Sequence, residues 1–360
     1  MNLNLLKGKK VLVTGHTGFK GSWLCHWLHE IGADVVGYSI NVPTNPSHFE
    51  ATGLSEIIKD IRGDILDLEN LRKVFKSENP DVVFHLAARP IVRDCYENPK
   101  LAFETNVIGT LNILECLRDS KVKAAVLITS DKCYENVEWE YGYREIDRLG
   151  GADPYSASKA CAEIVISSYF RSYFANHTCK IASVRAGNVI GGGDWADYRI
   201  VPDCVKSWSK NETLIVRSPN STRPWQHVLE PLSGYLTLAC TLLEDKKLAG
   251  ESFNFGPNSD VVQPVGELIE EMNKTWKAGK FKIEIPADQK KEAGLLKLSC
   301  DKALFHLKWK AVMDFTETIA MTAQWYQQFY QSPKDAKSKS KSQIKEYINL
   351  AKERGLPWAN

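Results

Sequence analysis

A tyrosine and a lysine stand four residues apart in the segment Tyr155-Ser-Ala-Ser-Lys159. On a helix, this spacing places both side chains on one face. A phenol is a poor base at neutral pH, but a neighbouring ammonium favours the phenolate and makes it a usable base. Because Tyr-x-x-x-Lys also arises by chance on protein surfaces, the pair predicts catalysis only if other elements of the chain bring a cofactor to it.

A glycine-rich stretch near the N-terminus is the element that would bring a cofactor. An apolar run leads into glycines at 15, 18 and 21, and an amphipathic segment, 22–31, follows. This order predicts a strand, a tight turn and a helix whose first N–H groups bind a pyrophosphate. A second apolar segment, 34–38, completes the context that favours dinucleotide binding. The loop residues expected at the cofactor are Gly15, His16, Thr17, Gly18, Phe19, Lys20 and Gly21.

Apolar and amphipathic segments alternate through the first half of the chain. This rhythm predicts an α/β fold, a doubly wound parallel sheet of the Rossmann type, with a smaller mixed α/β domain. The rhythm breaks near Gly187. We expect 1–187 to form the first domain, with 228–256 returning to it, and 188–227 and 257–360 to form the second domain and a tail. The expected strands are 11–14, 34–38, 57–64, 81–88, 124–129 and 180–185, and the expected helices 22–31, 68–77, 99–120, 156–175, 200–210, 231–243 and 316–331.

Three other segments look less regular. Residues 41–55 contain two prolines and predict a loop. The Lys/Ser-rich segment 332–342 favours a solvated linker over a basic tail that binds an acidic surface. The final stretch, 344–354, has the pattern of a short amphipathic helix.

The composition limits the class of protein. The 360 residues carry 46 Lys and Arg against 44 Asp and Glu, so nothing suggests nucleic acid as a partner. No apolar run approaches the ~18 residues of a membrane span, so no membrane partner is expected. Nine cysteines lack the spacing of metal ligands, so we expect no metal site and a reducing, cytoplasmic location.

Three further motifs give the chain a family resemblance. Phe84-His-Leu-Ala-Ala88, Asn106-Val-Ile-Gly-Thr110 and Thr129-Ser-Asp131 lie in order between the glycine loop and the Tyr/Lys pair. From residue 8 to about 330, the chain resembles the extended short-chain dehydrogenases/reductases that modify nucleotide sugars. The stretches 15–23, 129–134 and 185–195 resemble the 4,6-dehydratases that act on CDP-glucose. These enzymes start the route to the CDP-linked 3,6-dideoxyhexoses of bacterial O-antigens in lipopolysaccharide.

The resemblance implies roles for the polar residues after the strand at 124–129. Tyr155 would take the proton of the sugar 4-hydroxyl while NAD accepts hydride from C4. Asp131 would be the acid at O6, Lys132 the base at C5, and Ser130 would bond near O4. In dTDP-glucose dehydratases a glutamate stands where this chain has Lys132, so which of the two residues is acid and which is base stays open. Adjacent residues of opposite charge are also a common surface ion pair.

The resemblance also implies the binding residues, a homodimer or dimer of dimers through the helices at 99–120 and 156–175, and CDP-glucose as substrate. The second strand ends at Ser39 without a carboxylate or an arginine, so the loop itself favours neither NAD nor NADP. His16 and Lys20 could reach the pyrophosphate or the ribose 2′ position, and His16 could equally be a packed turn residue. Besides the glycine loop, Tyr155 and Lys159, the expected NAD contacts are Ser39, Asp64, Ile65, Leu86, Ala87 and Ala88. The expected substrate contacts are Arg89, Asn106, Asn188, Arg199, Arg217 and Arg223, of which Asn188 and Arg223 would meet the diphosphate.

Two alternatives remain at this level. A 4-epimerase or decarboxylase of the same family would use Tyr155 but leave Asp131 and Lys132 idle. A non-catalytic dinucleotide sensor would bind the cofactor without turnover, although such proteins often lose the Tyr/Lys pair.

Overall fold

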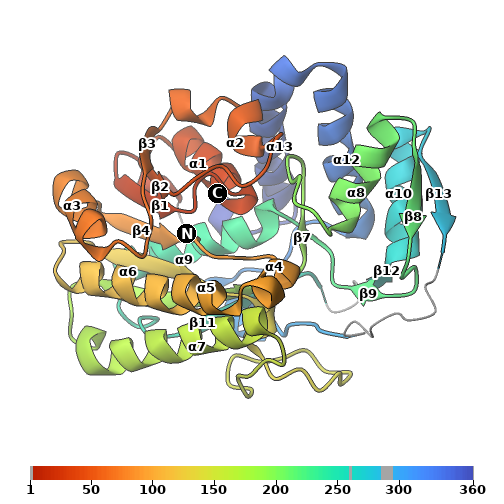
Figure 1. Ribbon diagram of the computed structural model, residues 1–360. Coiled ribbons are helices and arrows are strands. Elements are labelled where there is room, and N and C mark those ends of the chain that lie inside the picture. The colour runs from red at the N-terminus through yellow and green to blue at the C-terminus, as the bar shows by residue number, and fades with distance from the viewer. Residues whose placement is uncertain (1–2, 259–261, 285–294, 360) are drawn as a thin grey trace.

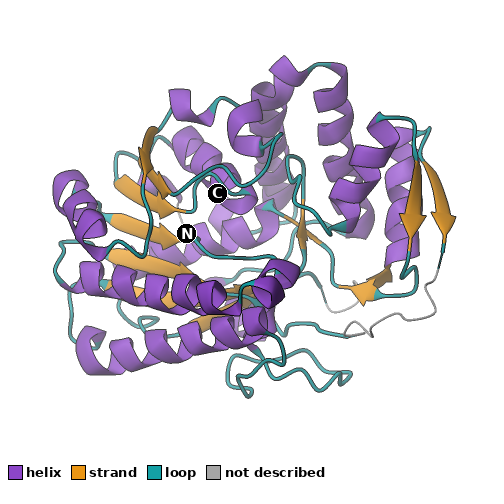
Figure 2. Ribbon diagram, in the orientation of Figure 1, coloured by secondary structure: helices purple, strands orange, loops and turns teal. Residues whose placement is uncertain are grey.

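A seven-stranded parallel sheet forms the centre of the computed structural model, which describes residues 3–258, 262–284 and 295–359 (Figures 1 and 2). Its strand order is β11-β6-β5-β4-β1-β2-β3, and every neighbouring pair is parallel. The predicted doubly wound sheet is therefore confirmed. The strands are β1 (Lys10–Thr14), β2 (Asp34–Ser39), β3 (Lys59–Arg62), β4 (Val82–His85), β5 (Ala124–Ile128), β6 (Lys180–Ala186) and β11 (Ser252–Phe255).

The central strands are buried on both faces. All residues of β4 and β5 are buried, as expected of parallel strands covered by helices on each side. The chain runs outward from β1 to β3 on one side and from β4 to β11 on the other. The strand order therefore reverses between β1 and β4, and ligands of such sheets bind beyond the carboxyl ends of the strands at this point.

Two layers of helices cover the sheet (Figure 1). One face packs on α1 (Phe19–Ile31) and α9 (Leu229–Glu244), and the other on α3 (Leu68–Glu78), α6 (Gly109–Arg118) and α7 (Pro154–Tyr169). The helices predicted at 99–120 and 156–175 each contain a π-helical turn, at Glu104–Ile108 and Phe170–Phe174. The first of these follows α5 (Pro99–Phe103), which is preceded by α4 (Val92–Glu97).

The second half of the chain adds a smaller group of elements beside the sheet (Figure 1). Two short strands, β8 (Thr213–Val216) and β13 (Lys280–Ile283), pair in parallel. The pairs β7–β10 and β9–β12 are two residues long in each strand. The remaining elements are β7 (Val189–Ile190), α8 (Ile200–Ser209), β9 (Thr222–Arg223), β10 (Gln226–His227), β12 (Gln263–Pro264), α10 (Val265–Trp276), α11 (Asp301–Leu307) and α12 (Phe315–Gln331).

The Lys/Ser-rich segment is helical, so the expectation of a solvated linker is wrong. Its residues 336–342 form the first part of α13 (Ala336–Glu353), which packs against α12 and α1. Small and polar residues, among them Ser340 and Gln343, make up part of its buried face, while its lysines point outward. The predicted loop 41–55 likewise contains a short helix, α2 (His48–Ala51). Among the helices within the described ranges, none has the length and apolar character needed to cross a membrane.

Candidate active site

The glycine loop forms a turn that only residues without side chains can make. Gly15 has φ +76°, and a Cβ there would lie 2.7 Å from the backbone nitrogen of Ala87. A Cβ on Gly21 would overlap the carbonyl of Gly15. Gly18 precedes α1 and offers no side-chain cap to it. The backbone N–H groups at this end of α1 are therefore available to an anionic ligand.

The two ionisable side chains of the loop, His16 and Lys20, have different surroundings. His16 is buried, with Nε2 2.8 Å from Asp60 Oδ1, and its ring fills the space beside Gly37. It is thus the packed turn residue of the two alternatives. Lys20 lies in the first turn of α1, where burial lowers the pKa of its ammonium to about 8 despite the opposing charge of Asp131. Lys20 therefore interacts through its charge with Asp131, one of the expected catalytic residues.

The expected NAD contacts lie at the carboxyl ends of β2, β3 and β4. Ser39 ends β2, and its Oγ accepts a 3.5 Å hydrogen bond from the Thr17 backbone. Asp64 and Ile65 follow β3, with Asp64 Oδ1 accepting from the Leu66 N–H at 2.9 Å. Leu86, Ala87 and Ala88 follow β4, and the N–H groups of the first two bond Thr14. The sheet thus brings these segments to one edge.

A hydrogen-bonded turn follows β5 and carries the expected acid and base. Ser130 Oγ donates to Asp131 Oδ1 at 2.9 Å and accepts from the Lys132 N–H at 3.3 Å. Burial raises the pKa of Asp131, although Lys132, Ser130 and Lys20 act in the opposite direction. A carboxyl group with a raised pKa keeps its proton more readily, which suits a general acid.

Tyr155 lies at the start of α7, in contact with the same turn. The helix is capped by Asp153, whose Oδ1 accepts from the Ser156 N–H at 3.0 Å. Burial raises the pKa of Tyr155 to about 12, and a hydrogen bond with Ser130 and the charge of Arg199 act against this rise. Ser130 therefore connects the phenol of Tyr155 with the carboxyl group of Asp131.

Lys159 lies one turn along α7, as its spacing predicts, and its Nζ donates to the Ile128 carbonyl at 3.4 Å. Burial lowers its pKa to about 8, and Glu163 opposes this shift. We expected Lys159 to supply the positive charge beside Tyr155. In the structure, the cation that acts to lower the pKa of Tyr155 is Arg199, which we expected only near the nucleotide.

Sequence reasoning missed Asp194, which holds Arg199. Asp194 Oδ2 lies 2.7 Å from Arg199 Nη1, and its carbonyl accepts a hydrogen bond from Tyr326 of α12. The charge of Asp194 raises the pKa of Arg199. The sequence shows that Asp194 and Arg199 are five residues apart. Because a loop separates them, this spacing alone does not predict that their side chains meet.

The other expected substrate residues are spread over several elements. Asn188 lies between β6 and β7, and its carbonyl accepts from the Gln226 N–H at 3.2 Å. Arg217 follows β8 and is exposed, and Arg223 lies in β9 with Nη1 donating to the Thr222 carbonyl at 2.7 Å. Their roles toward a ligand stay predictions.

Asn106 lies between the segment that follows β4 and α7. It is buried, and its side-chain oxygen accepts from the Arg89 N–H at 2.8 Å. Its side-chain amide donates to the Arg89 carbonyl and to Ser158 Oγ. The amide thus fixes the backbone after β4 against α7, and a contact of Asn106 with the substrate stays a prediction.

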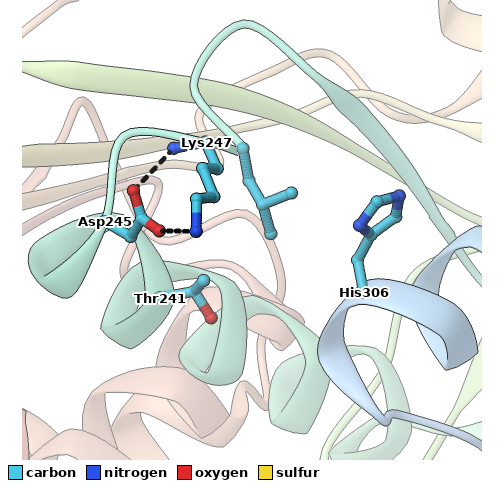
Figure 3. A pocket seen from close by; sticks show the side chains of 5 residues that line it. Thr241, Asp245, Lys247 and His306 are labelled. Carbon is cyan, nitrogen blue, oxygen red and sulfur yellow. Dashed lines mark hydrogen bonds and ion pairs between the residues drawn. The ribbon is translucent and has the colours of Figure 1, made fainter.

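A surface hollow of about 260 Å³ lies elsewhere (Figure 3). It forms after the carboxyl end of α9 and before β11, so it is at the amino-terminal edge of the sheet, opposite the catalytic turn. Its lining side chains are Thr241, Asp245, Lys247, Leu248 and His306.

Comparison with known proteins decides the family. A family model described as GDP-mannose 4,6 dehydratase matches residues 12–322. The chain belongs to this family. A CDP-glucose 4,6-dehydratase of Salmonella typhimurium is 45% identical over 352 residues, which cover 96% of this chain and 98% of that protein. The predicted resemblance to nucleotide-sugar dehydratases is thereby confirmed.

More distant members of the family and related solved structures share the fold. A dTDP-glucose 4,6-dehydratase of Shigella flexneri is 26% identical over 343 residues, covering 88% of this chain and 92% of that protein. The crystal structure of DesIV, a dTDP-glucose 4,6-dehydratase from Streptomyces venezuelae, aligns with a TM-score of 0.75 at 24% identity, over 89% of this chain and 97% of that one. The UDP-glucose 4-epimerase of Thermotoga maritima aligns at 0.77 and 22% identity, over 89% and 99%.

A buried ion pair between Glu163 and Arg185 holds the elements that carry this site. Glu163, four residues after Lys159, receives two bonds from Arg185 of β6, at 3.0 and 2.9 Å. Thr129 donates to the same carboxylate, and Arg185 Nη1 donates to Tyr134 Oη at 2.7 Å. Burial acts to raise the pKa of Glu163, but Arg185 and the hydrogen bonds from Thr129 and Ser183 together lower it below its ordinary value. The pair thus joins α7 to both ends of the catalytic turn.

Replacing Arg185 with Met should lower the free energy of unfolding by about 3–5 kcal/mol, because it leaves the Glu163 carboxylate buried without its cation. Urea unfolding followed by circular dichroism measures this loss. The double variant Glu163→Gln, Arg185→Met removes both charges and should lose less than the single variant. If the double variant lost as much unfolding free energy as the single variant, or more, a buried unpaired charge on Glu163 would not be the cause of the loss.

Proposed function

We propose that this protein converts CDP-D-glucose into CDP-4-dehydro-6-deoxy-D-glucose. The observation that carries the proposal is the linked group of Tyr155, Ser130 and Asp131 at the carboxyl end of the sheet. A phenol alone serves oxidation of a hydroxyl, whereas the adjacent buried carboxyl group gives the site an acid for eliminating water. The 45% identity with a protein named CDP-glucose 4,6-dehydratase supports the choice of sugar and base.

We propose NAD as the cofactor, and the residues present fit it. The cradle made by Gly15 and Gly21 has no room for a Cβ, which is the close backbone approach that a pyrophosphate requires. The start of α1 would bind the phosphates, while Ser39, Asp64 and Ile65 would hold the adenosine end. When bound, NAD supplies a hydride acceptor for C4 and returns that hydride to C6, so the reaction has no net redox change.

In the first half of the reaction, Tyr155 removes the proton of the sugar 4-hydroxyl as C4 becomes a ketone. Burial alone disfavours the phenolate of Tyr155, so the reaction needs the charge of Arg199 and the hydrogen bond between Tyr155 and Ser130. Asp194 keeps Arg199 charged and in place. These residues together make Tyr155 a base for the alcohol.

In the second half, Lys132 removes the proton at C5, which the ketone at C4 has made acidic, and Asp131 donates a proton to the hydroxyl leaving C6. The bond from C6 to oxygen breaks, and a C5–C6 double bond forms. The C6 hydroxyl thus leaves as water with the proton of Asp131, and the two protons taken from O4 and C5 serve to protonate C5 and to restore Asp131. After hydride returns to C6, a proton from the site completes C5.

The two parts of the chain would bind different molecules, one the cofactor and the other the substrate. We propose that 1–187, with 228–256, holds the dinucleotide and that 188–227 and 257–360 hold the CDP moiety. Asn188 and Arg223 of the second part would meet the diphosphate, Arg223 because guanidinium groups bond phosphate oxygens bidentately. Arg217 would lie near the nucleotide.

Three further proposals concern the setting of the enzyme. Exposed apolar side chains on the helices expected at a dimer interface, Phe103, Ile108 and Ile164, support a homodimer. Nine cysteines without a disulfide support a cytoplasmic location. The relation to the Salmonella protein supports a role in making the dideoxyhexoses of O-antigens.

The direct test is to incubate the protein with NAD and CDP-glucose in deuterium oxide. We expect a CDP-linked 4-keto-6-deoxy sugar, seen by its alkaline absorbance and mass, with deuterium at C5. UDP-glucose and dTDP-glucose under the same conditions test the base. Formation of CDP-galactose without a keto sugar would indicate an epimerase, and cofactor binding without turnover of any of these sugars would indicate a sensor.

A further inference from the structure

The end of β2 lacks the acidic residue that usually recognises the ribose of NAD. In dinucleotide folds this position, about 20 residues after the glycine loop, carries a carboxylate for the 2′-hydroxyl or has an arginine nearby for a 2′-phosphate. Here it is Ser39, which is buried and bonded to the loop. The discrimination between NAD and NADP must therefore come from neighbouring groups.

The neighbouring strand β3 supplies such groups. The register pairs Gly37 with Asp60 and Ser39 with Arg62. Opposed residues of adjacent strands share a face of the sheet and lie about 5 Å apart, so Asp60 and Arg62 flank the end of β2. Their side chains are 19% and 38% exposed, so both can meet a ligand.

The three ionisable side chains at this place form one cluster. Asp60 Oδ1 bonds His16 Nε2 at 2.8 Å, and Asp60 Oδ2 receives Arg62 Nε and Nη2 at 3.2 and 2.8 Å. The guanidinium also lies over the Phe49 ring, 5.1 Å from its centroid. Arg62 is therefore folded back onto Asp60, and His16 is held by the same carboxylate.

We propose that Asp60 determines the preference of this protein for NAD over NADP by holding Arg62 and so keeping its guanidinium from a phosphate at the ribose 2′ position. The inference rests on the proposed binding of a dinucleotide at the glycine loop. A 2′-phosphate would find the guanidinium already bonded to Asp60. Without Asp60, Arg62 could turn to such a phosphate and bond it through two N–H groups.

The test is to measure the binding of NAD and NADP to the purified protein by calorimetry, without substrate. The wild type should prefer NAD. In Asp60→Asn the ratio of the NADP to the NAD dissociation constant should fall about tenfold or more, the size expected of a gained charge-assisted bond. Asp60→Ser should give the same shift if the asparagine variant unfolds. The variant Asp60→Asn, Arg62→Ala should return to the wild-type ratio.

Asp81→Asn is the matched control, because it removes the same charge at the amino-terminal end of β4, where Asp81 pairs with Lys123. Its ratio should equal that of the wild type. An unchanged ratio in both Asp60 variants, an equal change in the control, or a gain that survives loss of Arg62 would overturn the inference. A wild type that binds neither dinucleotide would instead overturn the proposed function.

Discussion

Replacing Tyr155 with Phe should lower turnover of CDP-glucose by about 10²- to 10⁴-fold or more, the usual contribution of a general base. The change removes one hydroxyl from a buried side chain that packs beside Cys95 and Ala102. The fold and the glycine loop should therefore remain, and NAD should bind with nearly the wild-type dissociation constant. Single-turnover absorbance of the reduced nicotinamide measures the oxidation step directly.

Tyr169→Phe is the control for this experiment. Tyr169 lies on the same helix, and its hydroxyl donates to Glu115 at 2.8 Å, away from the catalytic turn. Its loss should leave turnover near the wild-type rate. Turnover of the Tyr155 variant within about tenfold of wild type would remove this residue from the mechanism, since no general base would then have been lost.

Local pattern was sufficient to predict the sheet and the cofactor loop. The strands of the sheet core are short apolar runs bounded by turns, and Gly15 and Gly21 stand where a Cβ would collide with neighbouring backbone. The spacing of Tyr155 and Lys159 is also a local feature, because both residues lie on one helix. Each of these features is encoded in neighbouring residues, so the sequence alone contains the needed information.

Features that depend on distant partners were missed. Ser340 is buried because Trp325 Nε1 and His48 Nε2 bond it, at 2.8 and 3.0 Å, so a polar residue sits on the inner face of α13. A polar, lysine-rich stretch gives no apolar period from which that face can be predicted. The contact of Asp60 with Arg62 is local, but its place beside Ser39 depends on the pairing of β3 with β2.

Asn106 shows the same limit in a site residue. A buried asparagine in a family motif is compatible with a ligand contact or with a bond to the backbone, and both use the same amide groups. Only the fold places it between Arg89 and Ser158. The type of residue was informative, whereas its partner required the structure.

The variant Asp131→Asn, Lys132→Met should separate oxidation from elimination. Tyr155 and Lys159 lie on α7 and remain, so C4 should still lose its hydride in a single turnover. Without an acid at O6 and a base at C5, no C5–C6 double bond forms to receive that hydride. Reduced nicotinamide should therefore accumulate on the enzyme, and deuterium from the solvent should no longer enter C5.

The single variants assign the two steps. Lys132→Met should have the larger effect on deuterium exchange at C5, and Asp131→Asn the larger effect on loss of the C6 oxygen, because burial raises the pKa of Asp131 and favours its protonated form. The same shift predicts that elimination by the wild type slows as rising pH removes the proton of Asp131. A double variant that neither binds NAD nor oxidises C4 would mean that the pair is structural. A double variant that still eliminates water near the wild-type rate would exclude both residues from the dehydration step. The acid and base would then have to be other ionisable groups of the site. Lys20 would be the first candidate, because its pKa is lowered to about 8 and it interacts with the charge of Asp131.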